Sequence, residues 1–159
     1  MWLWLKRSII MGFVLLIVIQ VIRPGRTNPS IDPTQEIAAS MAVDPMVASI
    51  LERSCNDCHS NRTVWPWYSN WAPISWLVAS DVNSGRRHLN FSKWSTYPLD
   101  KNGKMLDEIC KDVKENDMPP ATYTPMHSSA RLTKVDQDEI CRWTASARQS
   151  LMVGGAKNP

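Results

Sequence analysis

Five consecutive residues constrain this chain more than any other feature, and they read Cys55-Asn56-Asp57-Cys58-His59. The pattern C-x-x-C-H is the attachment signature of c-type haem. Two thiols at this spacing can reach the two vinyl groups on one edge of a porphyrin and form thioethers. The histidine that follows is then held under the ring, where a ring nitrogen can bind the iron. The motif predicts haem c attached through Cys55 and Cys58, with His59 as an iron ligand.

The two cysteines of this motif have three other interpretations. A thioredoxin-like redox pair would need a strand–helix–strand context, which the sequence does not indicate. A zinc site would need four ligands, and Cys110 and Cys141 do not form a second C-x-x-C pair. A plain structural disulfide between Cys55 and Cys58 is the third. The spacing favours haem attachment over all three.

A haem iron in a globular domain usually takes a second axial ligand from elsewhere in the chain. Met118 is the favoured candidate because it begins the run Met118-Pro119-Pro120. The two prolines remove backbone donors and fix φ, which gives a stiff segment that can hold a thioether against a ring face. We expect this segment in a loop that follows a helix ending near Asn116. Less favoured candidates are Met105, Met126, His88 and His127.

The aromatic composition is unusual, with 8 Trp against 2 Phe and 3 Tyr. Trp65, Trp67, Tyr68 and Trp71 all follow His59 within twelve residues. Aromatic rings bury large areas, so these side chains are candidates to cover a porphyrin face. They could equally fill the core of a small helical domain, and the two roles are compatible.

The first 26 residues predict a membrane anchor or a signal segment. An uncharged run, Ser8 to Ile22, lies between Lys6-Arg7 and Arg23. This run is shorter than the roughly 17–20 apolar residues of a full span, unless the first residues also enter the membrane. No small-x-small cleavage pattern follows Ile22, which favours an uncleaved anchor over a cleaved signal peptide.

The remaining sequence predicts an all-α domain with long loops that wrap a haem. Residues 27–43 contain two prolines and scattered polar residues and are expected to form a linker, followed by the domain over 44–152 and a flexible tail over 153–159. Helical spacing of apolar residues and capping signals predict helices over Pro45–Ser54, Ile74–Ser84, Gly103–Glu115 and Thr133–Leu151. Beyond the first 26 residues, 14 basic side chains face 15 acidic ones, so no basic face for nucleic acid is expected.

The two remaining cysteines, Cys110 and Cys141, fall in the last two predicted helices. A domain outside the cytoplasm permits a disulfide between them, and this is the favoured interpretation. Two buried free thiols are the alternative.

Several separated motifs together resemble the bacterial haem-binding domain family. They are Ser54 to Asn61 around the C-x-x-C-H motif, Trp65-Pro66-Trp67-Tyr68-Ser69, His88-Leu89-Asn90-Phe91-Ser92 and Met118-Pro119-Pro120. The resemblance runs from about Pro45 to Trp143 and implies a small cytochrome-c-like domain with covalent haem, anchored to a membrane or secreted. Met118 matches the family's MPP element, and its role as a ligand follows from similarity to cytochromes c.

Three functions follow as hypotheses. The favoured one is one-electron transfer by a single-pass membrane protein whose haem domain lies on the periplasmic side and exchanges electrons with a redox partner protein. The alternative is a haem peroxidase or a gas or redox sensor, whose sixth coordination position is open or labile. The third is a disulfide-stabilised binding or structural module without haem.

Overall fold

The structure, a computed structural model, describes residues 1–155, and this part of the chain is helical with no strand, which confirms the predicted all-α class. The α-helices are α1 (Trp2–Ile19), α2 (Ile37–Ser40), α3 (Pro45–Ser54), α4 (Asn56–His59), α5 (Ile74–His88), α6 (Leu99–Glu115) and α7 (Lys134–Gly155). Four short 3-10 helices connect them: η1 (Pro33–Gln35), η2 (Trp67–Asn70), η3 (Phe91–Thr96) and η4 (Ser128–Ala130). Residues 156–159, most of the expected flexible tail, lie outside the described part.

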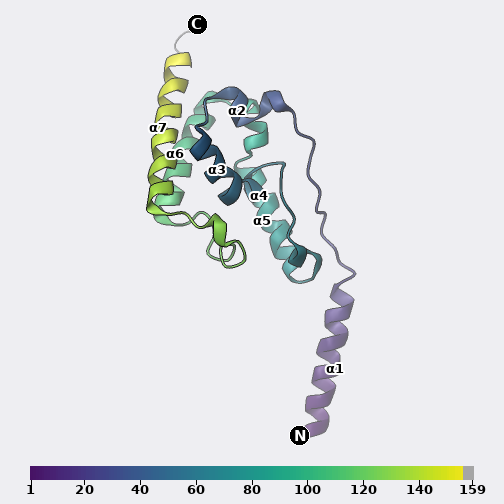
Figure 1. Cartoon of the computed structure of the whole chain (residues 1–159). Coiled ribbons are helices and arrows are strands. Elements are labelled where there is room, and N and C mark those ends of the chain that lie inside the picture. Colours follow the sequence, from purple (N-terminus) through teal and green to yellow (C-terminus); the bar gives the residue numbers. More distant parts are fainter. Residues whose placement is uncertain (156–159) are drawn as a thin grey trace.

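The two longest helices of the domain, α6 and α7, pack side by side and form one wall (Figure 1). A disulfide joins Cys110 of α6 to Cys141 of α7, with an S–S distance of 2.01 Å. A core on the inner side of this wall is built around Trp94, which is fully buried. The other large buried side chains of this core are Val47, Leu51, Leu89, Phe91, Met105, Leu106 and Trp143.

The helix starts follow the capping signals of the sequence. The Asp44 carboxylate accepts a hydrogen bond from the backbone N–H of Met46 at 2.8 Å, and Pro45 occupies the first helical position of α3. At the start of α7, the Thr133 hydroxyl accepts from the backbone N–H of Asp136, while the Asp136 carboxylate accepts from the backbone N–H of Thr133. These bonds satisfy amide donors that a helix start leaves without partners.

Three helices are longer than the sequence predicts, and one of them, α7, continues to Gly155 instead of ending at Leu151. Helix α6 begins at Leu99, four residues before the predicted start, and Gly103 is buried inside it. Helix α5 continues past Gly85, where the sequence predicts an end, and stops at His88. A Cβ at Gly85 would lie 2.6 Å from the backbone oxygen of Cys58, so this glycine permits close packing of α5 on α4 rather than ending the helix.

The segment over 27–43, predicted as a linker, packs on the domain instead. It forms η1 and α2, and Ile37 is buried in the core. The Asn28 side chain donates to the backbone oxygen of Thr63, and the Asn61 side chain donates to that of Ser30. Apolar burial and these two polar contacts explain why a segment rich in proline and polar residues is held against the domain.

Helix α1 projects away from the helical domain, and none of its residues is buried (Figure 1). Its length and composition would allow it to cross a membrane. Its end touches the domain, because the side chain of Gln20 both donates to and accepts from the backbone of Ala72, at 3.0 and 2.9 Å.

Candidate cofactor site

The C-x-x-C-H motif lies at the junction of α3 and α4. Cys55 ends α3 and begins α4, and its backbone oxygen accepts hydrogen bonds from the backbone N–H groups of Cys58 and His59, at 3.1 and 2.9 Å. This single helical turn places positions 55, 58 and 59 on one face, since residues three and four apart are neighbours on a helix. Both thiols and the imidazole ring are half-buried and line the same hollow.

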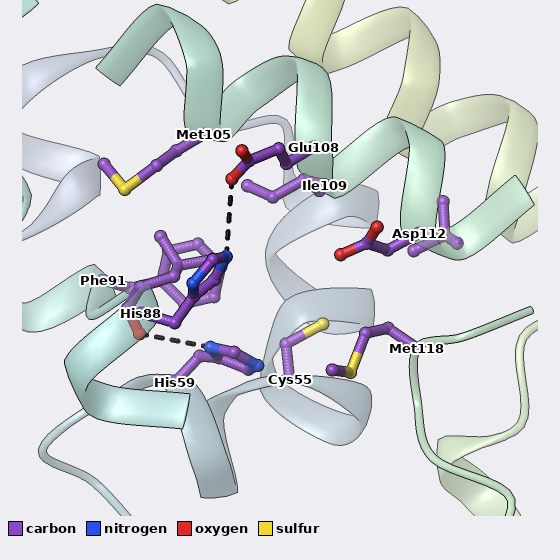
Figure 2. A pocket seen from close by; sticks show the side chains of 11 residues that line it. Cys55, His59, His88, Phe91, Met105, Glu108, Ile109, Asp112 and Met118 are labelled. Atoms are coloured by element: carbon purple, nitrogen blue, oxygen red, sulfur yellow. Dashed lines mark hydrogen bonds and ion pairs between the residues drawn. The ribbon is translucent and has the colours of Figure 1, made fainter. Parts of the chain in front are cut away.

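This face opens on two adjoining hollows of about 500 and 780 Å³, counting the space open to solvent. Both are lined by Cys55, His59, His88 and Met118, so we treat them as one site and call it the slot. Cys55, His59 and Met118 lie on one side of the slot, opposite α6 with Met105, Glu108, Ile109 and Asp112 (Figure 2).

A backbone hydrogen bond fixes the ring of His59. Its Nδ1 lies 3.1 Å from the carbonyl oxygen of Leu89. A carbonyl oxygen can only accept, so Nδ1 carries the proton and Nε2 keeps its lone pair. Burial lowers the pKa of His59, which favours the neutral ring. An imidazole oriented by such a bond is the usual form of a histidine ligand to a metal.

The two thiols of the motif are protonated at neutral pH and are not bonded to each other. Burial raises the pKa of Cys55 to about 12, and the nearby Cys58 adds to the effect. Burial also raises the pKa of Cys58 to about 11, with further contributions from the carboxylates of Asp57 and Asp81. A thiol kept neutral by burial is a weak nucleophile toward general reagents.

The end of α6 brings Met118 to the slot. Asn116 adopts a left-handed conformation, with φ of 63°, which asparagine tolerates better than most residues. The backbone N–H groups of Asp117 and Met118 both donate to the backbone oxygen of Asp112, at 2.9 and 3.2 Å. The Gln137 side chain on α7 donates to the Asn116 side chain at 2.9 Å. The chain therefore turns back over the last turn of α6 and places Met118 in the slot.

A second contact fastens the Met118 loop to the motif. The Tyr123 hydroxyl donates to the Asp57 carboxylate at 2.7 Å. The ring of His127 stacks on that of Tyr123, with centroids 4.0 Å apart and an interplanar angle of 10°. Sequence reasoning missed both Asp57 and Tyr123 as functional residues. Asp57 lies within the motif itself, but no spacing rule links it to a tyrosine 66 positions later.

The structure separates the candidates for the second axial ligand. Met118 and His88 both line the slot. His88 is exposed, and its Nε2 lies 3.4 Å from a carboxylate oxygen of Glu108 (Figure 2). Met105 reaches the slot wall but is 3% exposed and belongs to the core. Met126 and His127 do not line the slot.

The aromatic residues expected over a porphyrin, Trp65, Trp67 and Tyr68, do not line the slot itself. Trp67 and Tyr68 line an adjoining groove of about 1120 Å³, counting the space open to solvent, which shares Asp57, Cys58 and Tyr123 with the slot. Trp67 is 71% exposed. Trp65 lines neither the slot nor this groove. The apolar lining of the slot comes instead from Leu89, Phe91, Met105, Ile109 and Val113. The ring centroids of His59 and Phe91 are 6.4 Å apart.

Two of the separated sequence motifs meet through hydrogen bonds between buried polar residues. The Asn90 side chain donates to the Asn61 side chain at 2.9 Å, and the backbone N–H of Asn61 donates to the Ser92 hydroxyl at 3.1 Å. All three residues are buried. This network joins the residues that follow His59 to the segment containing Leu89, whose carbonyl oxygen holds the His59 ring.

Arg86 connects α5 to the same region. Its Nε donates to the backbone oxygen of Ser60 at 2.8 Å, and its Nη2 donates to the Thr63 hydroxyl at 2.7 Å. Arg86 does not line the slot, although its neighbour in sequence, His88, does. The adjacency of Arg86, Arg87 and His88 in sequence thus does not place an arginine beside the histidine in the slot.

These residues fit a covalently attached haem. Two reduced thiols, an imidazole with a free Nε2 and a methionine border one largely apolar slot, and the closeness of α5 to α4 at Gly85 holds the motif in place. A family model described as a haem-binding domain matches residues 14–146. No curated protein and no solved structure matches the chain significantly.

Proposed function

Because the chain belongs to the haem-binding domain family and is a haem-binding protein, we propose that the slot holds haem c, linked by thioethers to Cys55 and Cys58. In this proposal His59 and Met118 are the axial ligands. The protein transfers single electrons at the outer face of a membrane to which α1 anchors it.

The observation that carries this proposal is the state of His59. The Leu89 carbonyl accepts the Nδ1 proton, so the free Nε2 belongs to the same face as the two thiols. The buried Asn61–Asn90–Ser92 network holds the segment that supplies this carbonyl. The ring orientation is therefore fixed by the fold before any cofactor binds, which lowers the cost of ordering the ligand.

Met118 completes a nitrogen and thioether donor pair. The turn at Asn116 and the Tyr123–Asp57 bond hold its loop at the slot from both ends. A haem iron with histidine and methionine ligands has no open coordination position, so its chemistry is one-electron exchange. The apolar side chains that line the slot exclude water, and a dry surrounding raises the reduction potential of such a centre.

The anchor and the place where haem is attached support the proposed location. Haem is attached to C-x-x-C-H motifs outside the cytoplasm, so the domain lies outside and the start of α1 lies inside. Helix α1 is long and apolar enough for this role, with no buried residue. The partner is then a redox protein that reaches the outer face of the membrane crossed by α1.

One observation favours the alternative of a haem enzyme or gas sensor. His88 lines the slot beside Glu108 and could act as an acid or base near a bound ligand. No arginine accompanies it there, since the Arg86 side chain is bonded to Ser60 and Thr63. We therefore place electron transfer first.

Spectroscopy of the matured full chain separates the two functions. The electron-transfer proposal predicts a sulfur-to-iron charge-transfer band in the magnetic circular dichroism of the ferric protein, its loss in Met118→Ala, and slow binding of CO to the reduced protein. His88→Ala is the matched control and should keep the band. A spectrum without the band, together with rapid CO binding to the unmodified chain, would support the sensor or enzyme instead.

A further inference from the structure

The end of the domain nearest α1 exposes large apolar side chains. Trp67 is 71% exposed, Trp71 60%, Ile74 48% and Leu77 55%. We call these four residues the end patch. Ile74 and Leu77 are three residues apart and share one face of α5, while Ser75, Ala79 and Val82 bury the other face. A helix at a water-exposed surface normally shows a polar outer face, so a second apolar face needs a partner.

Residues adjacent to the end patch are hydrogen-bonded to the end of the anchor. Gln20, which ends α1, makes two hydrogen bonds with the backbone of Ala72, the residue that follows Trp71. The indole N–H of Trp76 donates to the backbone oxygen of Ile22 at 2.7 Å. Figure 1 shows this end of α5 beside the end of α1. If α1 spans a membrane, these bonds place the end patch at the depth where the span leaves the lipid.

Charge at this end matches a lipid surface. Residues 1–31 and 64–80 contain no Asp or Glu. Arg23 is exposed just beyond α1, and Arg26 donates to the side chains of Asn70 and Ser69, at 2.7 and 3.1 Å. Basic side chains at the membrane surface are attracted to lipid phosphates, and tryptophan is enriched at headgroup depth.

From these contacts we infer that the end patch is a second membrane contact, seated in the headgroup region of the leaflet from which α1 emerges. The inference rests on the proposed anchor and extends it: α1 fixes the domain to the membrane, and the end patch fixes its orientation. The groove lined by Trp67, Ile74, Leu77 and Met126, whose lining also contains Asp57 and Asp81, then opens beside this membrane contact. Because Cys58 lines the same groove, the cofactor attachment site is held at a constant height above the membrane.

Fluorine NMR on the full chain tests this contact. The protein is labelled with 5-fluorotryptophan and placed in nanodiscs of phosphatidylcholine and phosphatidylglycerol, with or without a headgroup-spin-labelled phosphatidylcholine. Trp67→Phe and Trp71→Phe assign their two resonances. We expect the spin label to broaden both beyond detection, while Trp94, which is fully buried in the core, stays sharp. Each spectrum is compared with that of the same protein in nanodiscs without the spin label, so any broadening caused by the iron cancels.

Trp2 and Trp4 lie at the far end of α1, so their resonances report insertion of α1 independently of the end patch. If they broaden while Trp67 and Trp71 stay as sharp as Trp94, α1 is inserted and the end patch is not, and the inference is wrong. If Trp2 and Trp4 also stay sharp, the anchor itself is wrong and the inference fails with it. A protein partner or second copy covering the patch would give the first of these outcomes.

A charge variant gives an independent check. The double variant Ile74→Glu and Leu77→Glu should restore a sharp Trp71 resonance in the presence of the spin label, since carboxylates are repelled from the anionic surface. Leu99→Glu is the control, because Leu99 is 58% exposed on α6. Continued broadening of Trp71 in the double variant would contradict the inference.

Discussion

The phenol of Tyr123 donates a 2.7 Å hydrogen bond to the carboxylate of Asp57, across 66 positions of sequence. Asp57 lies between the two cysteines of the motif, and Tyr123 lies five residues after Met118. The bond therefore connects the proposed covalent side of the cofactor site to the proposed ligand loop. We expect this bond to position Met118, although neither Tyr123 nor Asp57 is itself a proposed ligand of the iron.

Replacing Tyr123 with Phe should loosen this loop. A hydrogen bond to a charged group contributes about 1.5–3 kcal/mol, so the fraction of protein with Met118 detached should rise about tenfold or more. The measurements are the intensity of the sulfur-to-iron charge-transfer band and the rate of CO binding to the reduced protein. Tyr97→Phe removes a hydroxyl away from the slot and serves as the control. Equal spectra and equal CO rates in both variants would show that the bond does not position Met118.

Gly85→Ala should destabilise the motif helix. The new Cβ would lie 2.6 Å from the backbone oxygen of Cys58, so α4 and α5 would have to separate. Overpacking of this kind costs about 1–3 kcal/mol of unfolding free energy. Urea unfolding measures this cost, and the yield of haem-stained protein reports the motif geometry. Gly12→Ala is the control, since nothing lies within 4 Å of a Cβ there. Unchanged stability of Gly85→Ala would mean that the close packing has no energetic role.

The carboxyl of Asp136 should make stability depend on pH. Burial alone would raise its pKa, but hydrogen bonds from the backbone and hydroxyl of Thr133 and from the guanidinium of Arg53 lower it overall. A carboxyl with a lowered pKa stabilises the fold above its unfolded-state pKa of about 3.9, and this contribution is lost as pH falls through the lower folded-state value.

Asp136→Asn should therefore cost about 1–3 kcal/mol of unfolding free energy at pH 7, and the difference from the unmodified chain should shrink as the pH falls below about 3.9. Urea titrations at a series of pH values measure both effects. Asp138→Asn, which removes an exposed pair with Lys134, should change stability by less than about 1 kcal/mol. A cost for Asp136→Asn that stays constant down to the acid limit would contradict the assignment.

Removing the Cys110–Cys141 disulfide should lower stability without changing the cofactor site. The bridge closes a loop with a sequence separation of 31, and the chain-entropy relation gives about 3–4 kcal/mol for a loop of this size. The Cys110→Ser and Cys141→Ser double variant should unfold at lower urea concentration yet keep the haem spectrum of the unmodified chain. A changed spectrum at neutral pH would show that the wall formed by α6 and α7 also shapes the slot.

Local signals in the sequence predict much of this molecule. The Asp44 and Thr133 caps and the apolar period of α6 each act over a few residues, and the structure contains the helices they predict. The position of Met118 after α6 is also a local consequence of Asn116 and the prolines. Its role as a ligand remains a prediction.

Local signals of this kind do not predict contacts between segments that are distant in the sequence. Gly85 reads as a helix end because nothing in the residues around it shows that Cys58 packs against it. Residues 27–43 read as a linker because two prolines and scattered polar residues interrupt their apolar residues, and only the folded core shows that Ile37 is buried in it. Trp67 reads as a cofactor cover because aromatic side chains are usually buried, whereas in the structure Trp67 is 71% exposed, five residues before Ala72, to which Gln20 is bonded.

The central claim is covalent attachment of haem through Cys55 and Cys58, and the intact mass of natively matured protein tests it most directly. The protein is produced with the cytochrome c maturation machinery, denatured and treated with an alkylating reagent. The account predicts the mass of the chain plus one haem, with no alkyl group on Cys55 or Cys58. Colourless protein with the mass of the bare chain and alkyl groups on both thiols would contradict it.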